Sequence, residues 1–414
     1  MNTAVGFSIP CRACGQFGLR NVLSLGHTPL ANALLTREQL KQPEPTFPLD
    51  LVFCPACTLL QITESVRPEQ LFGEYLYFSS FSDTMLAHSQ NLVERLIAEH
   101  SLSTNSLVVE IASNDGYLLQ FYRQRRIPVL GIEPARNIAV VARKRQIPTI
   151  CDFFSLALAK QLRRDGKRAG IIHAHNVLAH VPALNGVVAG MRELLHDAGC
   201  IVIEVPYARD MLDRCEFDTI YHEHLCYFSL SALDRLFARH ELTIYRVERV
   251  PIHGGSLRLF IAHAASAPRS RPSVARLLQE EDEWGVDKPE RYRSFAARVE
   301  RLAEQLRDLL YGQKNRGRRL AAYGASAKGS TLLNYLRLNP GTIEFVVDRS
   351  TVKQGHYTPG THLPIFAPEQ LLSEMPDCVL LLTWNFAEEI LQQQAEYRQR
   401  GGIFILPIPE VQVV

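Results

Sequence analysis

Short apolar runs alternate with amphipathic stretches through the middle of the chain. SLVVEIA, VLGIEP, the start of IIHAHNVLAH and CIVIEVP have the length and composition of buried strands. Between and before them, apolar residues recur with helical spacing, and we expect helices over 85–100, 116–125, 136–145 and 185–197. Strands that alternate with helices predict a parallel sheet covered on both faces.

The same alternation returns towards the end of the chain. Residues 275–315, rich in Glu, Arg, Leu and Ala, are predicted to be helical. The strand-like runs RLAAYG, TIEFVVD, DCVLLLTW and GIFILPIP follow, with a helix expected over AEEILQQQAEYRQR. A second, smaller α/β lobe is therefore expected. We divide the chain into 1–65, 66–270, a helical connector at 271–315, and 316–414.

Two C-x-x-C pairs mark the first segment. CRAC contains Cys11 and Cys14, and CPAC contains Cys54 and Cys57. A two-residue gap lets both thiolates of a pair turn towards one point, and two pairs supply the tetrahedral sulfur set that structural Zn²⁺ prefers. Because four protein ligands leave no open position for a substrate, the zinc is expected to hold the module together. Redox or incidental pairs are the alternative.

Composition narrows the range of partners. The 414 residues carry a formal net charge of only +2, which argues against a protein that binds nucleic acid by neutralising phosphates. No apolar run approaches the roughly 18 residues that a membrane span needs, and the first residues lack the pattern of a signal peptide. The other five cysteines are scattered, which fits a reducing, cytoplasmic setting.

A loop of small and polar residues follows the first central strand. In VVEIASNDGYLL, Glu110 ends the strand, and Ala112, Asn114 and Gly116 precede the helix. Ligands of open α/β sheets bind at the carboxyl ends of strands, where small residues let the backbone approach closely. Glu133, at the end of the next strand, is placed to accept hydrogen bonds from a ribose diol. An ordinary turn with a solvated acid is the alternative.

Histidines and tyrosines gather after the run CIVIEVP. EFDTIYHEHLCYFS contains Tyr221, His222, Glu223 and His224. Histidine titrates near neutral pH, so imidazoles beside a carboxylate can provide a general base. The two histidines are too close in sequence for the H-E-x-x-H zinc pattern. A polar surface loop is the alternative.

Two other segments carry candidates for the same cleft. His180, in VLAHVP, also follows a strand of this region. Upstream, EYLYFSSFSDT contains Tyr75 and Tyr77 beside several serines, a composition that suits a sugar. A packed histidine and a polar loop are the respective alternatives.

The C-terminal lobe begins with its own glycine-bounded loop. AYGASAKGS places Ser326 and Lys328 between two glycines at the start of an expected helix. Backbone N–H groups at a helix start favour an anion, and the lysine adds a positive charge, so a nucleoside diphosphate is the expected ligand. Three residues of later loops are also expected to reach the nucleotide: Lys353, Tyr357 and Asn385. NAD, disfavoured by the absence of G-x-G-x-x-G, and a purely structural lobe are the alternatives.

The loop after Glu110, followed by Glu133, resembles the class I S-adenosylmethionine-dependent methyltransferases. In that family the first loop holds the methionine part of the cofactor and the acid holds the ribose. The resemblance implies that Asp152 and Phe153 flank the adenine and that Asn176 faces the cofactor. Ala112 departs from the pattern, because glycine is common at its position.

The order of motifs resembles the nucleotide-sugar C-methyltransferases over essentially the whole chain. The motifs are the paired C-x-x-C module, EIASNDG, GIEP, YHEHLCYFS and AYGASAKGS. The resemblance implies an α/β protein with a zinc-binding N-terminal module, a Rossmann-like class I methyltransferase centre and a smaller Rossmann-like lobe for the sugar nucleotide.

The resemblance also implies a reaction. His224 would remove the proton at C3 of a nucleoside-diphosphate 4-keto-deoxysugar, and the enolate would take a methyl group from S-adenosylmethionine. Tyr221 and Glu223 would be neighbours of the base, and the sugar would be bound or polarised by Tyr75 and His180. Two other interpretations stay open: an O- or N-methyltransferase acting on another small molecule, and a zinc-bearing binding protein without catalysis.

Overall fold

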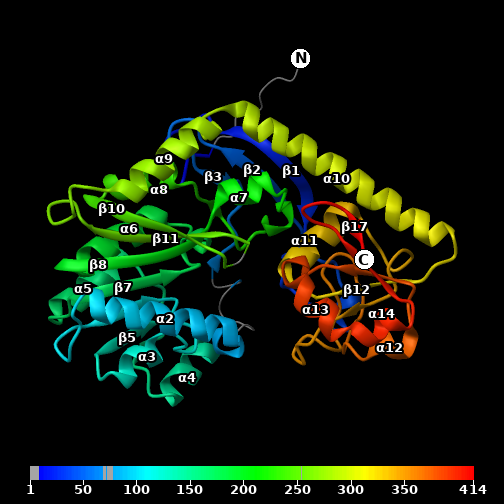
Figure 1. Cartoon of the computed structure of the whole chain (residues 1–414), viewed down its shortest axis with the longest axis horizontal. Helices are drawn as coiled ribbons and strands as arrows, with labels where there is room; N and C mark the ends of the chain where they lie inside the picture. Colours follow the sequence, from blue (N-terminus) through cyan, green and yellow to red (C-terminus); the bar gives the residue numbers. More distant parts are fainter. Residues whose placement is uncertain (1–8, 69–70, 72–77, 253) are drawn as a thin grey trace.

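The structure is a computed structural model that describes residues 9–68, 71, 78–252 and 254–414 (Figure 1). Two expected sugar-binding residues, Tyr75 and Tyr77, lie outside the described residues. Sheets of four, seven and six strands organise the described chain. They match the N-terminal module, the centre and the C-terminal lobe of the sequence analysis, so the α/β class with two α/β units is confirmed.

A small antiparallel sheet forms the N-terminal module. It contains β1 (Arg20–Thr28), β2 (Phe47–Phe53) and β3 (Leu60–Ile62). The fourth strand, β9 (Cys226–Tyr227), comes from the centre of the chain and pairs with β3, with Leu60 opposite Tyr227. The segment YHEH (residues 221–224), called the YHEH loop below, ends one residue before β9. It is therefore anchored to the module by a long-range contact that no local pattern predicts.

The central sheet has the strand order β10-β11-β8-β7-β4-β5-β6. Its parallel strands are β4 (Val108–Ile111), β5 (Val129–Ile132), β6 (Thr149–Ile150), β7 (Ala169–His175) and β8 (Leu195–Pro206). An antiparallel hairpin of β10 (Leu242–Val250) and β11 (Ser256–His263), unassigned from sequence, continues the sheet beyond β8. The direction of winding reverses between β4 and β7, and ligands of open sheets bind at such a switch point.

Seven helices accompany this sheet in the described residues. They are α2 (Asp83–Glu99), α3 (Leu119–Gln124), α4 (Arg136–Lys144), α5 (Leu156–Arg164), α6 (Leu184–Leu194), α7 (Ala208–Asp213) and α8 (Leu230–Ala238). All four helices expected from sequence are present. α3 begins later than expected because Gly116 has a φ of +81°, and α6 ends earlier because β8 begins at the next residue.

Two helices connect the centre to the C-terminal lobe, as expected for 271–315. They are α9 (Pro272–Trp284) and α10 (Pro289–Asn315), and both begin at a proline, whose missing N–H costs nothing in the first turn. With 27 residues, α10 is about 40 Å long. It runs from the central domain across to the C-terminal lobe (Figure 1).

The C-terminal sheet has the order β14-β13-β12-β15-β16-β17. Its strands are β12 (Leu320–Tyr323), β13 (Val346–Val347), β14 (Ile365–Phe366), β15 (Cys378–Leu381), β16 (Ile403–Leu406) and the antiparallel β17 (Gln412–Val413). Its helices are α11 (Ala327–Leu336), α12 (Gln370–Glu374), α13 (Ala387–Gln393) and α14 (Ala395–Gln399). The single helix expected over 387–400 is broken in two at Gln394, whose φ of −99° and ψ of 27° leave the helical region.

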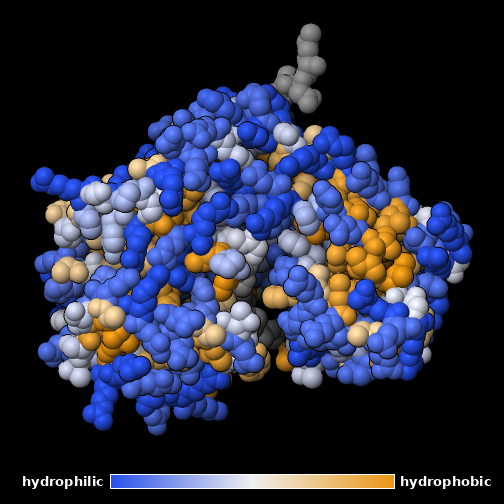
Figure 2. All heavy atoms as spheres, in the orientation of Figure 1, coloured by the Kyte–Doolittle hydropathy of each residue, from blue (hydrophilic) through white to orange (hydrophobic). Residues whose placement is uncertain are grey.

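The C-terminal lobe contacts both other parts. Helix α11 lies against the turn η4 (Phe217–Thr219), and Thr331 Oγ1 donates to the carbonyl of Ile220 at 3.3 Å. Tyr357, expected to reach the nucleotide, instead forms a backbone bridge with Leu35 of the N-terminal module. The visible surface is mostly hydrophilic, with a broad apolar area on the C-terminal lobe near the end of α10 and smaller ones on the central domain (Figure 2). None of the described helices is both long and apolar enough to cross a membrane.

Candidate active site

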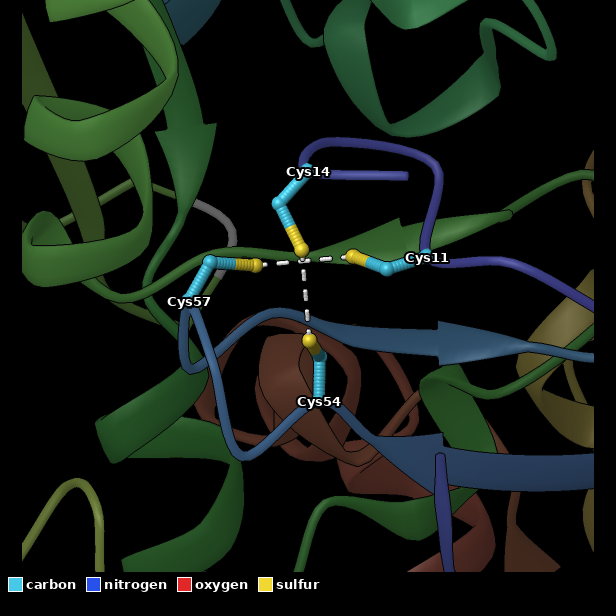
Figure 3. A group of neighbouring side chains, drawn as sticks. All are labelled: Cys11, Cys14, Cys54 and Cys57. Atoms are coloured by element: carbon cyan, nitrogen blue, oxygen red, sulfur yellow. Dashed lines mark hydrogen bonds between the residues drawn. The ribbon is translucent and has the colours of Figure 1, made fainter. Parts of the chain in front are cut away.

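Four cysteine side chains of the N-terminal module point towards one another (Figure 3). Cys11 and Cys14 lie on a turn before β1, and Cys54 and Cys57 on the turn after β2. The Sγ atoms of Cys11 and Cys57 are 3.4 Å apart, and all four Sγ atoms lie within 4.8 Å of one another. Because a tetrahedral ion with bonds of about 2.3 Å separates its sulfur ligands by about 3.8 Å, the site has the size that zinc requires.

The protonation of these thiols also suits a bound cation. Hydrogen bonding with Cys11 lowers the pKa of Cys54 and raises the pKa of Cys57. The crowded thiols therefore resist ionising together, whereas Zn²⁺ stabilises four thiolates at once. All nine cysteines lie in the described residues and all are free, so no disulfide competes for these four.

A cavity of about 710 Å³ lies at the carboxyl edge of the central sheet and extends to the C-terminal lobe. The expected site residues that line it are Ala112, Asn114, Glu133, Phe153, Asn176, His180, Tyr221, His224, Lys328 and Asn385. Other described residues of the expected site lie outside its lining: Glu110, Gly116, Asp152, Glu223, Ser326, Lys353 and Tyr357.

The loop after β4 has a strained backbone. Ala112 and Asn114 have φ angles of +52° and +48°. Asparagine tolerates this region, whereas alanine costs roughly 1–2 kcal/mol there. Asn114 Oδ1 accepts a hydrogen bond from the N–H of Ser79 at 2.9 Å, which ties the loop to the segment before α2. Gly116 shapes the loop from outside the cavity, because a Cβ there would lie 2.6 Å from the side chain of Ile147.

Glu133 closes this loop from the end of β5. Its two carboxylate oxygens accept hydrogen bonds from the N–H groups of Asn114 and Ala135, both at 2.9 Å. Burial raises the pKa of Glu133, and the two N–H donors oppose the rise. Each oxygen has a further lone pair, so the carboxylate can accept ribose hydroxyls while it holds the loop.

Two of the expected cofactor residues lie beside the cavity rather than on its wall. Glu110 is buried beneath the loop, and burial together with the charge of Glu133 raises its pKa well above the usual range. Asp152 is exposed, and its Oδ1 accepts from the N–H of Phe153, whose ring lines the cavity. Direct contact of either acid with the cofactor stays a prediction.

The end of β7 presents two polar side chains to the cavity. Asn176 has a φ of +56°, and its buried Oδ1 has no hydrogen-bond partner among the described residues. Such an acceptor suits an N–H donor of a ligand, so the wall fits the expected cofactor. His175, which was not expected from the sequence, lines the same wall with Nδ1 3.2 Å from the carboxylate of Glu204. Its position beside Asn176 at a strand end is the signal that the sequence offers.

His224 and Tyr221 form a hydrogen-bonded pair on the cavity wall. Tyr221 Oη lies 2.8 Å from His224 Nε2, and His224 Nδ1 lies 3.0 Å from the carbonyl oxygen of Thr219. Because a carbonyl only accepts, Nδ1 carries the proton and Nε2 has the lone pair that accepts from Tyr221. His224 therefore has a basic nitrogen next to Tyr221, and Thr219 stabilises the opposite N–H when the ring becomes cationic.

His180 lies beside this pair, with its ring centroid 4.8 Å from that of His224. Its Nδ1 donates to the carbonyl oxygen of Glu223 at 2.7 Å, so Nε2 is the accepting nitrogen. Burial lowers the pKa of His180 to about 4, so the ring is neutral at physiological pH. In this tautomer His180 can accept from a sugar hydroxyl but has no second N–H with which to polarise a ketone.

The other two side chains of the YHEH loop face the N-terminal module. His222 Nε2 donates to the carbonyl oxygen of Pro48 at 3.1 Å. Glu223 Oε1 accepts from Asn32 Nδ2 at 2.6 Å, and burial raises the pKa of Glu223 to about 7. The side-chain hydrogen bond of Glu223 therefore joins the loop to the module rather than to His224.

The C-terminal lobe presents Lys328 and Asn385 to the cavity. They lie at the carboxyl ends of β12 and β15, between which the winding of this sheet reverses. Lys328 Nζ lies 4.7 Å from the ring centroid of Trp384, and no ion pair among the described residues includes this ammonium group. A cation at a switch point, without an ion-pair partner in the described chain, suits an anionic ligand.

Two other expected residues, one in this loop and one in a later loop, hold the shape of the loop after β12. Ser326 Oγ caps α11 by accepting from the N–H of Gly329 at 3.1 Å. Lys353 Nζ donates to the carbonyl oxygen of Ala325 at 2.8 Å and lies 3.5 Å from Asp348. Asp348 also accepts from the N–H of Ala325. This N–H group of the loop is therefore already bonded to a carboxylate and is not available to an anionic ligand.

Known protein families divide the chain in the same way as its sheets. A zinc binding domain matches residues 11–72, a methyltransferase domain matches 85–247, and a C-methyltransferase C-terminal domain matches 251–409. Together with the cavity at the switch point, these matches define an S-adenosylmethionine-dependent class I methyltransferase with a zinc-binding module.

One relative matches almost the full length. C-methyltransferase NovU of Streptomyces niveus is 39% identical over 404 residues, which cover 98% of this chain and 96% of that protein. The chain belongs to the C-methyltransferase family.

Solved methyltransferase structures are similar to part of the chain at low identity. Magnesium protoporphyrin IX methyltransferase ChlM from Synechocystis, with bound SAH, is 15% identical over 47% of this chain and 91% of its own, with a TM-score of 0.35. The CcbJ methyltransferase from Streptomyces caelestis is 12% identical over 42% and 89%, with a TM-score of 0.33. Scores this low carry no conclusion about substrate.

Proposed function

We propose that this C-methyltransferase methylates C3 of a nucleoside-diphosphate 4-keto-deoxysugar. One observation carries the proposal: a single cavity brings together the Tyr221–His224 pair, the cofactor wall around Glu133 and the ammonium group of Lys328. The cavity thus combines a base, a site for the methyl donor and a site for an anion. Carbon methylation of a substrate that carries a diphosphate requires all three.

A sugar carbon becomes nucleophilic only when an adjacent carbonyl acidifies its C–H bond. The C4 ketone acidifies C3, and His224 Nε2 takes the proton while the electron pair of the C–H bond forms the enolate. Tyr221 donates to that nitrogen in the structure, so its hydroxyl has to turn away when Nε2 accepts the proton. The Tyr221 hydroxyl can then donate to the enolate oxygen. S-adenosylmethionine, when bound, supplies the electrophilic methyl group.

The position of the substrate follows from the two ends of the cavity. Lys328 and Asn385 suit the diphosphate and its nucleoside, and His180 suits a sugar hydroxyl as an acceptor. Tyr75 and Tyr77 stay predictions as sugar-binding residues. No nucleic-acid or membrane partner enters the proposal, and we keep the expectation of a reducing, cytoplasmic setting.

A substrate screen tests the proposal directly. TDP-, CDP- and GDP-4-keto-6-deoxysugars are incubated with S-adenosylmethionine, and products are analysed by mass for one added methyl group and by NMR for its position. We expect a methyl group on C3. A methyl group on C5, the other carbon beside the ketone, would contradict the assigned position, and one on oxygen or nitrogen would support the alternative O- or N-methyltransferase.

A further inference from the structure

A buried carboxyl lies near Lys328 without a role in the proposed reaction. Glu216, between α7 and η4, lines the cavity, and its side chain is 5% exposed. Its Oε1 has no hydrogen-bond partner among the described residues, and Arg214 NH1 is 3.9 Å away. A buried carboxylate normally has several hydrogen-bond or ion-pair partners. Glu216 therefore requires either a partner from a bound ligand or a proton that neutralises it.

The backbone around Glu216 makes room for this carboxyl. Gly254, on the turn between β10 and β11, has a φ of +85°, and a Cβ there would lie 2.9 Å from Glu216 Oε2. Any larger residue would be strained and would press on the carboxyl. The turn therefore provides space for Glu216 while burying it.

Charged groups of both signs act on Glu216 from several elements. Lys328 of α11 and Arg214, after α7, favour its ionised form, whereas Asp218 of η4 and Asp210 of α7 oppose it. The turn residue against the carboxylate is Gly254, which brings no charge. Burial, the largest influence, raises the pKa of Glu216 to about 7.

We infer that Glu216 is the built-in counter-charge of Lys328, and that it takes up a proton when the diphosphate of the sugar nucleotide binds this lysine. The inference rests on the proposed function, because it takes Lys328 as the diphosphate site. A bound diphosphate adds negative charge beside Glu216 and Asp218 in a poorly solvated cavity. One proton from solvent, forming an O–H bond on Glu216, removes one of these like charges.

Binding therefore depends on pH. Without substrate, Glu216 is about half ionised near pH 7, and with diphosphate bound its pKa is higher. Between these two values each bound nucleotide sugar takes up a proton. Affinity accordingly falls as pH rises above 7, by up to about tenfold per pH unit.

Calorimetry with nucleotide sugars that lack a ketone tests this linkage without turnover. TDP-glucose, CDP-glucose and GDP-mannose are titrated at pH 7 and 8 in two buffers that differ in ionisation enthalpy. Their diphosphate diesters do not titrate in this range, so the counted protons belong to the protein. We expect uptake of up to about half a proton at pH 7 and up to about one at pH 8.

Three variants assign the proton. Glu216→Gln should lose the uptake and bind about tenfold more tightly than wild type at pH 8, because one opposing charge is gone. Lys328→Met should weaken binding. Because the two residues are coupled, Glu216→Gln should change the affinity of Lys328→Met by a different factor than it changes the affinity of wild type. Glu290→Gln, at an exposed acid of α10, is the control and should behave as wild type.

The outcomes separate this inference from the proposed function. Undiminished proton uptake in Glu216→Gln, or the same pH dependence as wild type, overturns the role of Glu216 and leaves the nucleotide site intact. If none of the three nucleotide sugars binds wild type, or if Lys328→Met binds as tightly as wild type, the proposed nucleotide site fails and the inference fails with it.

Discussion

The cavity has two proposed halves, one for the cofactor and one for the substrate, and they are assembled in different ways. The cofactor half comes from the central domain, where the ends of neighbouring strands bring Asn114, Glu133 and Asn176 together. The substrate half combines distant parts of the chain, because His224 precedes a strand of the N-terminal sheet and Lys328 belongs to the C-terminal lobe. Binding of the methyl donor and recognition of the acceptor should therefore respond to different substitutions.

Loss of zinc is the largest expected disturbance of the substrate half. Cys54→Ser should abolish stoichiometric zinc binding and destabilise the module by several kcal/mol, since structural zinc contributes on the order of 10 kcal/mol to folding. Because β9 pairs with β3, the YHEH loop loses its support and turnover falls with the metal. S-adenosylmethionine binding, measured by calorimetry, should persist within a few-fold.

Metal analysis of the wild type should show about one zinc per chain. Cys151→Ser, at a cysteine outside the cage, serves as the control and should keep the metal. Full zinc content with an unchanged melting temperature in Cys54→Ser would show that the four thiols are not a metal site.

Removal of the proposed base, His224, tests the chemical step in the substrate half. His224→Ala should lower turnover by roughly 10²–10⁴, the usual contribution of a positioned base, while both ligands still bind. His222→Ala is the matched control, because this side chain donates to Pro48 instead of lining the cavity. It should lower the melting temperature and keep turnover within about tenfold of wild type. Near-normal turnover in His224→Ala would move the base to His180 or Tyr75.

The cofactor half should respond to Glu133. Glu133→Ala should weaken S-adenosylmethionine binding by roughly 1.5–3 kcal/mol, the range for losing hydrogen bonds to a charged group. Nucleotide-sugar binding should change little, which is what separates the two halves. Asp152→Ala, at an exposed acid beside the same wall, should cost less than Glu133→Ala in the same calorimetric measurement. Equal affinity of Glu133→Ala and wild type would remove Glu133 from the cofactor site.

A smaller effect is expected in the pH dependence of stability. The pKa of Glu223 is about 7 in the folded chain against an ordinary value of 4.5, so the folded state holds a proton that the unfolded state has lost between these values. Its contribution to stability therefore decreases as pH rises from about 4.5 to 7 and then levels off. Between pH 5 and pH 8 the free energy of unfolding of wild type should fall relative to that of Glu223→Gln by on the order of 1–3 kcal/mol. Denaturant titrations at both pH values measure this, and identical differences in the two proteins would contradict it.

The same division explains how much of the site the sequence predicts. Glu133 and Asn176 each follow a strand end, so local pattern and the family resemblance were enough to place them on the cavity wall. His222 and Glu223 stood beside His224 in sequence, but their partners are Pro48 and Asn32 of the N-terminal module. A neighbour in sequence can thus face the opposite way when a distant segment provides the hydrogen-bond partner.

Long-range pairing also accounts for what was missed. Glu216 is an ordinary acid in the sequence, and only the C-terminal lobe brings Lys328 near it. The hairpin of β10 and β11 carries charged residues that hide its strand pattern. Arg246, for example, pairs with Glu99 of α2, and Glu248 pairs with Arg258 on the neighbouring strand. The parallel strands of the centre, apolar and bounded by helices, needed no such partners to be recognised.

Proton removal from C3 by His224 is the step on which the proposed chemistry depends. It can be followed alone by NMR, in heavy water, with a 4-keto-deoxysugar nucleotide and S-adenosylhomocysteine in place of the methyl donor. Wild type should exchange the C3 proton for deuterium, and His224→Ala should lose this exchange at the same ligand occupancy. If His224→Ala exchanges the C3 proton as fast as wild type, the assignment of His224 as the base is contradicted.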